Sequence, residues 1–197
     1  MIDAIDTLAG IAPGSAVDAA RARRLQARTH AQASHDALFR PADPSGVTLP
    51  ERLAVATFVA GLHGQEGAAT FYAEGLASNG AAPALCVAVR AAVAEALGKG
   101  PYGSFPSGPL TREDAPGPAY QVGDQRIALG PRLAAALEHA HMLVLHPRDA
   151  TPGHLQALLD AGWDTLGIVT LSQLVAFLSY QVRVAAGLRV LATVSSI

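Results

Sequence analysis

Apolar positions recur every three to four residues along most of the chain, which is the spacing of one face of an α-helix. In the first such segment, residues 17–39, apolar side chains lie on one side and Arg21, Arg24 and Arg28 on the other, which we interpret as a solvated face. Further helices are predicted over 48–63, 66–78, 83–97, 131–145, 151–161 and 164–193. No segment alternates with the period of a half-buried strand, so the sequence predicts an all-α fold.

Residues 98–130 lack a helical period and are rich in proline and glycine; we call them the Pro/Gly tract. A stretch of this length is too long for an ordinary connection. It is either a mobile linker or a functional lid, and its aromatic residues Tyr102, Phe105 and Tyr120 favour order. We therefore expect an N-terminal helix and linker over 1–47, followed by a helical domain over 48–197 that carries the tract.

A weak internal repeat connects the helices on the two sides of the tract. Leu76–Gly80 resembles Leu158–Gly162, and Arg52–Ala54 resembles Arg132–Ala134. Two copies of one helical unit are the economical interpretation.

Composition narrows the classes of function. The chain has 197 residues, of which 50% are hydrophobic and 15% charged, with a net charge of −2. This excludes a mainly disordered protein and argues against nucleic-acid or anionic-membrane partners. The acidic N-terminus is unlike a secretory signal, so we expect a cytoplasmic protein. The uncharged stretch between Asp164 and Arg183 contains polar residues, which favours a buried core or interface helix over a membrane span.

Sulfur and metal chemistry are also limited. Cys86 is the sole cysteine, which excludes disulfides, CxxC redox pairs and Cys-rich metal sites, and we expect it in the core. His139 and His141 are too close in sequence to share one helix face, and His146 and His154 add no acidic ligand pattern. We expect no metal and no cofactor.

The arrangement from Glu51 onward resembles the AhpD-like superfamily, which includes the carboxymuconolactone decarboxylase proteins. The resemblance rests on Glu51–Val55, on Leu158–Trp163 and on Phe177–Arg183. It implies an AhpD-like helical bundle and a homo-oligomer, with the C-terminal helix buried against a second copy. Peroxidatic members use a CxxC pair, but here His63 and Glu66 stand at the cysteine positions and Thr70 at the histidine position. Thiol peroxidase activity is therefore not expected.

The decarboxylase branch implies acid–base chemistry on a small carboxylate or lactone without a cofactor. His63 would be the acid–base residue, oriented by Glu66, with Glu51 tuning the pocket. Arg183 would anchor a substrate carboxylate, and Tyr102 and Phe105 would contact the substrate. The structural alternatives are a capping box for Glu51, helix-end charges for His63 and Glu66, and an ion pair or interface contact for Arg183.

Two functions stay open at this point. The protein is a cofactor-free enzyme with a small-molecule substrate, or it is a catalytically degenerate member that binds a small molecule or a partner. Convergence of Glu51, His63 and Glu66 on one cavity would favour the enzyme. A Glu51 that only caps its helix, together with a His63 that faces water, would favour the binding protein.

Overall fold

The computed structural model describes residues 3–44 and 46–194, and these form helices and connecting segments without a named strand. The all-α prediction is therefore confirmed. The helices are α1 (Ala4–Ala9), α2 (Ala16–Ala22), α3 (Leu25–Phe39), α4 (Leu49–Leu62), α5 (Glu66–Ser78), α6 (Pro83–Ala96), α7 (Arg126–Leu145), α8 (Pro152–Asp160) and α9 (Thr165–Val194). Two 3₁₀ turns, η1 (Pro109–Glu113) and η2 (Pro147–Asp149), complete the secondary structure.

The N-terminal segment differs from the sequence-based prediction. The pattern over residues 17–39 predicts one helix, but the chain breaks at Arg24, which has φ −113° and ψ 49°. The expectation of a solvated arginine face is wrong for Arg21, which is buried and pairs with Asp3 and Asp6. These ion pairs fix α1 against α2, a tertiary arrangement that helical periodicity cannot reveal.

Helix α4 is the centre of the core. Thr48 caps it, accepting a hydrogen bond from the Glu51 amide while the Glu51 side chain accepts one from the Thr48 amide at 2.8 Å. Every residue from Arg52 to Leu62 is buried, because α5, α6, α7 and α9 all pack against this helix. A nearly all-apolar helix is stable only in such an enclosed position.

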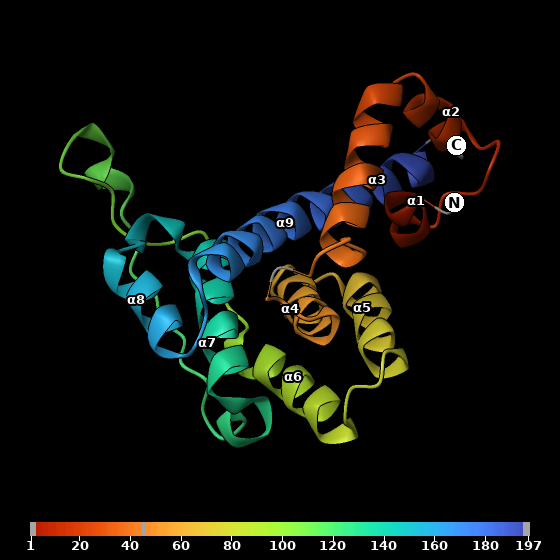
Figure 1. Ribbon diagram of the computed structural model, residues 1–197. Coiled ribbons are helices and arrows are strands. Elements are labelled where there is room, and N and C mark those ends of the chain that lie inside the picture. The colour runs from red at the N-terminus through yellow and green to blue at the C-terminus, as the bar shows by residue number, and fades with distance from the viewer. Residues whose placement is uncertain (1–2, 45, 195–197) are drawn as a thin grey trace.

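Helix α9 connects the two ends of the molecule (Figure 1). It contacts α4, α7 and α8, and it also contacts the N-terminal helices α1, α2 and α3. Its buried face is built from large aliphatic side chains such as Leu171, Leu174 and Leu178. Helices α4, α5 and α6 precede most of the Pro/Gly tract, and helices α7, α8 and α9 follow in the second half of the chain. Gly80 and Gly162, which correspond in the internal repeat, both have positive φ (81° and 90°).

The Pro/Gly tract folds onto the end of α7. The Tyr102 amide donates to the Leu145 carbonyl at 2.8 Å, and Gly103 forms an isolated bridge with Ala115. The Tyr102 hydroxyl donates to the Pro118 carbonyl at 2.6 Å. A Cβ at Gly117 would lie 2.2 Å from the Tyr102 ring, so this contact requires glycine. The tract therefore has a defined conformation across its base, and α7 begins within it, with a kink at Gly130 (φ 73°).

Candidate functional site

His63 ends α4 and is half-buried. Its Nε2 lies 3.1 Å from the hydroxyl oxygen of Ser179 on α9. Burial, together with the nearby positive charge of Arg183, lowers the pKa of His63 to about 4. The imidazole is therefore neutral at pH 7. Arg183 is exposed and forms no ion pair with an acidic residue among those the structure describes.

The structure does not bring the predicted carboxylates together around His63. Glu51 lies twelve residues earlier, about 18 Å along the helix at 1.5 Å per residue. Its carboxylate is engaged by Thr48 and by Arg132, whose Nε donates to Oε1 at 2.7 Å. Glu66 is exposed in the first turn of α5. Glu51 therefore caps α4, which was the structural alternative to a catalytic role, and it also forms an ion pair with Arg132.

The two aromatic residues predicted to contact substrate lie in the Pro/Gly tract. Tyr102 is buried and stacks on His146 with ring centroids 5.0 Å apart. Phe105 lies under the guanidinium of Arg148, 4.1 Å from its ring centroid. None of the six predicted site residues lines any of five pockets found among the described residues.

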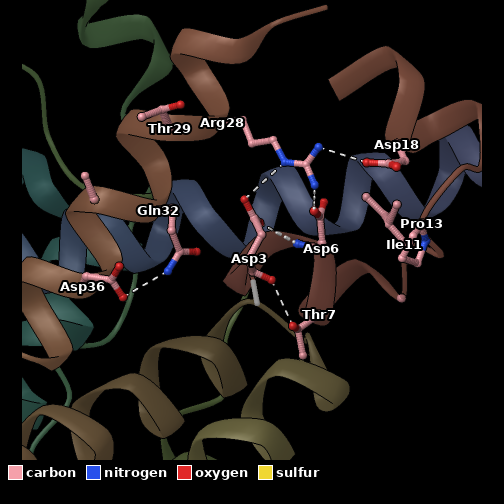
Figure 2. Close-up of a pocket in the computed structure, with 12 residues that line it drawn as sticks. Asp3, Asp6, Thr7, Ile11, Pro13, Asp18, Arg28, Thr29, Gln32 and Asp36 are labelled. Atoms are coloured by element: carbon pink, nitrogen blue, oxygen red, sulfur yellow. Dashed lines mark hydrogen bonds and ion pairs between the residues drawn. The ribbon is translucent and has the colours of Figure 1, made fainter. Parts of the chain in front are cut away.

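A cavity of about 830 Å³ lies among α1, α2 and α3 (Figure 2). Asp3, Asp6 and Asp18 point into it, and Arg28 pairs with all three. Burial alone would raise the pKa of Asp3, but hydrogen bonds and the charges of Arg21 and Arg28 outweigh it and hold that pKa below its usual value. The two guanidinium groups of Arg21 and Arg28 therefore pair with all three carboxylates and compensate two of their three negative charges.

A smaller cavity of about 320 Å³ lies between α7, α8 and residues 119–121, and we call it the histidine pocket. Three imidazoles line it, together with a carboxylate, a tyrosine and small side chains. The lining residues are Ala119, Tyr120, Gln121, Ala135, Glu138, His139, Met142, His146, Thr151, Gly153, His154 and Ala157. The volume lies within the range of small-molecule sites.

The hydrogen bonds of these histidines fix where their ring protons lie. Ser172 donates its hydroxyl hydrogen to the Ile168 carbonyl at 2.9 Å, so Nε2 of His139, 3.2 Å from the same oxygen, must be the donor. Nδ1 of His139 therefore has a free lone pair, and it has no hydrogen-bond partner.

His146 has the opposite arrangement. Its Nδ1 lies 3.3 Å from Oδ2 of Asp149, and the negative charge of that carboxylate favours a proton on Nδ1. The other carboxylate oxygen of Asp149 accepts from the Ser104 amide at 2.9 Å, which fixes its orientation. Nε2 of His146 is left as a buried acceptor without a partner. A carboxylate that orients an imidazole in this way raises its capacity to take up a proton.

Burial keeps these histidines uncharged. It lowers the pKa of His139 to about 4, with a further contribution from His154. Burial also lowers the pKa of His146, although Asp149 opposes the shift. His141, on the next face of α7, has its pKa lowered to about 4 by burial and by His146. At pH 7 His139 and His146 therefore offer neutral imidazoles to the histidine pocket, the form that accepts protons.

The base of the Pro/Gly tract covers this part of the molecule. Tyr102 stacks on His146, and the Tyr120 ring lies 5.1 Å from the His141 ring. Sequence reasoning missed the site because it weighed His139, His141, His146 and His154 only as metal ligands. No group of three or more metal-ligating side chains meets in residues 3–44 and 46–194. The sequence offered only their proximity as a signal, because His139 lies in α7 and His146 is the non-helical C-cap of that helix.

No protein-family model, curated protein or solved structure matches this chain. Its function is therefore inferred from the residues and their geometry.

Proposed function

We propose that this chain is a cofactor-free acid–base enzyme of the AhpD-like type, with the histidine pocket as its site for a small organic molecule. The observation that carries the proposal is the pairing of Asp149 with Nδ1 of His146, which leaves Nε2 of a neutral imidazole unpartnered beside a cavity of about 320 Å³. Convergence of a cavity with titratable groups of shifted pKa is typical of functional sites.

The chemistry would be proton transfer. Nε2 of His146 accepts a proton from an acidic C–H or O–H bond of the ligand, and Asp149 stabilises the imidazolium that forms. His146 exchanges this proton with solvent whenever the lid is open, and it returns a proton to another atom of the ligand, which completes an isomerisation or assists loss of a leaving group. His154 lies at the pocket with Nδ1 accepting from the Thr151 amide at 3.1 Å, so its Nε2–H is a donor for a developing oxyanion. A small carboxylate or lactone, the substrate class that the family resemblance implies, supplies such a carbon acid.

Access to His146 requires movement of the tract. Nε2 of His146 has no appreciable solvent exposure, and Tyr102 covers one face of its ring. Residues of the tract would open to admit the ligand and close over it, as a lid does. This agrees with the lid interpretation of the tract and excludes water from the proton-transfer step.

Proton exchange is the direct test, because it detects the acid–base step whatever the overall reaction is. Candidate lactones and carboxylic acids are incubated with the protein in D₂O, and loss of the ligand C–H signal is followed by proton NMR. We expect exchange catalysed by the wild-type protein and abolished in His146→Gln. The matched control is His30→Gln, since His30 is exposed on α3.

A thermal-shift screen of the same compounds separates the alternatives. A ligand at a hundred times its dissociation constant should stabilise the native state by about 2.7 kcal/mol. If the wild type binds a compound without catalysing proton exchange, and His146→Gln abolishes this binding, the chain is a catalytically degenerate binding protein and not an enzyme. Binding or exchange that His63→Ala abolishes and His146→Gln leaves unchanged would place the site at His63 and overturn the proposal.

A further inference from the structure

The charged groups around the histidine pocket make its electrostatic field negative. Among the described residues that line it, Glu138 carries the one carboxylate, and neither arginine nor lysine is present. Glu138 accepts from the Val122 amide at 2.9 Å and pairs with Arg126, and both contacts fall on Oε1. Burial and the charges of Glu95 and Glu138 raise the pKa of Tyr120 in the pocket wall to about 12, although Arg126 opposes the shift. A ligand carboxylate would therefore meet a negative field and no guanidinium or ammonium group.

The same pocket contains acceptors that need donors. Nδ1 of His139 and Nε2 of His146 are buried and have no hydrogen-bond partner among the described residues. The other nitrogen of His139 is held by Ser172 of α9, which does not line the cavity, so Nδ1 is the nitrogen of this ring that remains for a ligand. Residues 119–121 of the Pro/Gly tract line the cavity, so opening of the tract admits a ligand to both histidines. Such a ligand must supply O–H or N–H groups, and a carboxylate group at pH 7 supplies neither.

The separation of the two histidines sets the length of the ligand. His146 is the C-cap of α7 and follows His139 by seven residues, about 10 Å at 1.5 Å per residue. The hydroxyl that His139 binds is therefore not the one on the carbon that gives its proton to His146, but one some carbons further along the same molecule. The cavity volume of about 320 Å³ lies at the lower end of the range for small-molecule sites, so the ligand is compact.

We propose that the substrate of the histidine pocket is an uncharged polyhydroxy carbonyl compound, such as a short sugar in its open-chain form. His139 is then a specificity residue that accepts a hydrogen bond from one of the hydroxyl groups of the substrate. The inference rests on the proposed function, because it takes His146 as the acid–base residue.

The reaction needs no oxidant or reductant. Nε2 of His146 removes a proton from the carbon beside the carbonyl group, and the electron pair of that C–H bond moves to the carbonyl oxygen. The resulting enolate oxygen lies beside the Nε2–H of His154, and His146 then returns a proton to carbon. In D₂O the returned proton is a deuteron, so the step is visible as exchange.

The test compares three hydroxymethyl ketones that share the same acidic carbon. Erythrulose adds two further hydroxyls, hydroxymethyl ethyl ketone adds none, and a hydroxymethyl ketone with a propanoate arm adds a carboxylate. Each is incubated with the full chain in D₂O, and loss of the hydroxymethyl proton signal is followed by NMR above the rate without protein. We expect kcat/KM to be at least about tenfold higher for erythrulose than for either of the others, since one hydrogen bond or one repelled charge has an effect of about that size.

Two variants assign the preference to residues. His139→Leu removes the acceptor and should bring the ratio of kcat/KM for erythrulose to that for the ethyl ketone down to about one. Glu138→Gln removes the negative charge and should raise kcat/KM for the propanoate ketone relative to erythrulose at least about fivefold. The matched control is Glu74→Gln, exposed on α5, which should change neither ratio. A ratio does not depend on the fraction of the protein that is folded, so a destabilised variant still tests the preference.

The outcomes separate this inference from the proposed function. Exchange that depends on His146 but is equal for erythrulose and the ethyl ketone, or faster for the propanoate ketone, overturns the inference and leaves the acid–base site in place. A preference for erythrulose that His139→Leu retains also overturns it. Absence of exchange in all three ketones, in the lactones and in the carboxylic acids overturns the proposed function together with the inference.

Discussion

The buried histidines of α7 make the stability of this protein depend on pH below neutrality. The pKa of His139 and of His141 is lowered to about 4 in the folded protein, from 6.5 in an unfolded chain. Between these values the unfolded chain binds a proton at each site and the folded protein does not. Acid therefore favours unfolding, and stability is lost as the pH falls from about 6.5 towards 4.

The size of the effect follows from these pKa values. At pH 5 the unfolded form of each histidine is almost fully protonated, and the folded form is about one-tenth protonated. Each group then removes about 2 kcal/mol from the free energy of unfolding, relative to pH 7. His139 and His141 are 4% and 2% exposed, so solvent screens the effect little. Together they should remove about 4 kcal/mol, a large share of the stability of an ordinary domain.

Urea denaturation at about pH 7 and about pH 5 measures this loss. In the double variant His139→Gln/His141→Gln both titrating groups are absent, and an amide can still donate to Ser172 and to the backbone of Ala96. We expect the difference between the two pH values to shrink by about 4 kcal/mol in this variant. An equal difference in both proteins, or an NMR titration that finds either wild-type pKa near 6.5, would refute the reasoning.

Two further predictions concern the core. Arg52→Met removes the donors to the carbonyls of Val47 (2.9 Å) and Leu38 (2.7 Å), and it should lower the free energy of unfolding in urea by about 3–5 kcal/mol. Arg90→Met, at an exposed position, should stay within about 0.5 kcal/mol of the wild type. Gly61→Ala places a Cβ 2.4 Å from Val93 and should lower the melting temperature, corresponding to about 1–3 kcal/mol, unless Val93→Ala is added. Gly67→Ala, which has open space around it, should instead raise the melting temperature.

Local signals predicted most of the helices. The capping box at Thr48, the proline at position 83 and the glycine at position 162 each mark a helix boundary that the structure contains. Helix α1 was missed because six residues are too few for a periodic pattern, although Asp3 and Gly10 cap its two ends. The break at Arg24 has no glycine or proline to announce it.

The candidate site was beyond such signals. The orientation of His146 depends on Asp149, and that of Asp149 on the backbone of Ser104, which is 45 residues away in sequence. Glu51, by contrast, carried a complete local explanation as a cap, and the structure confirms that explanation. A residue whose local sequence already accounts for it is a poor candidate for catalysis. No capping or turn motif in the neighbouring sequence explains the histidines of α7. They were therefore better candidates for a functional site than Glu51.

The unpartnered nitrogens give the histidine pocket its strongest physical claim to a function. Five buried polar side-chain atoms lack a hydrogen-bond partner in the described residues, and two of them, Nδ1 of His139 and Nε2 of His146, belong to residues that line the histidine pocket. Each such acceptor costs about 1–3 kcal/mol. A leucine at 139 or a phenylalanine at 146 would remove that cost and fill the same space. Stability therefore does not explain imidazoles there, whereas a ligand that donates hydrogen bonds to them does.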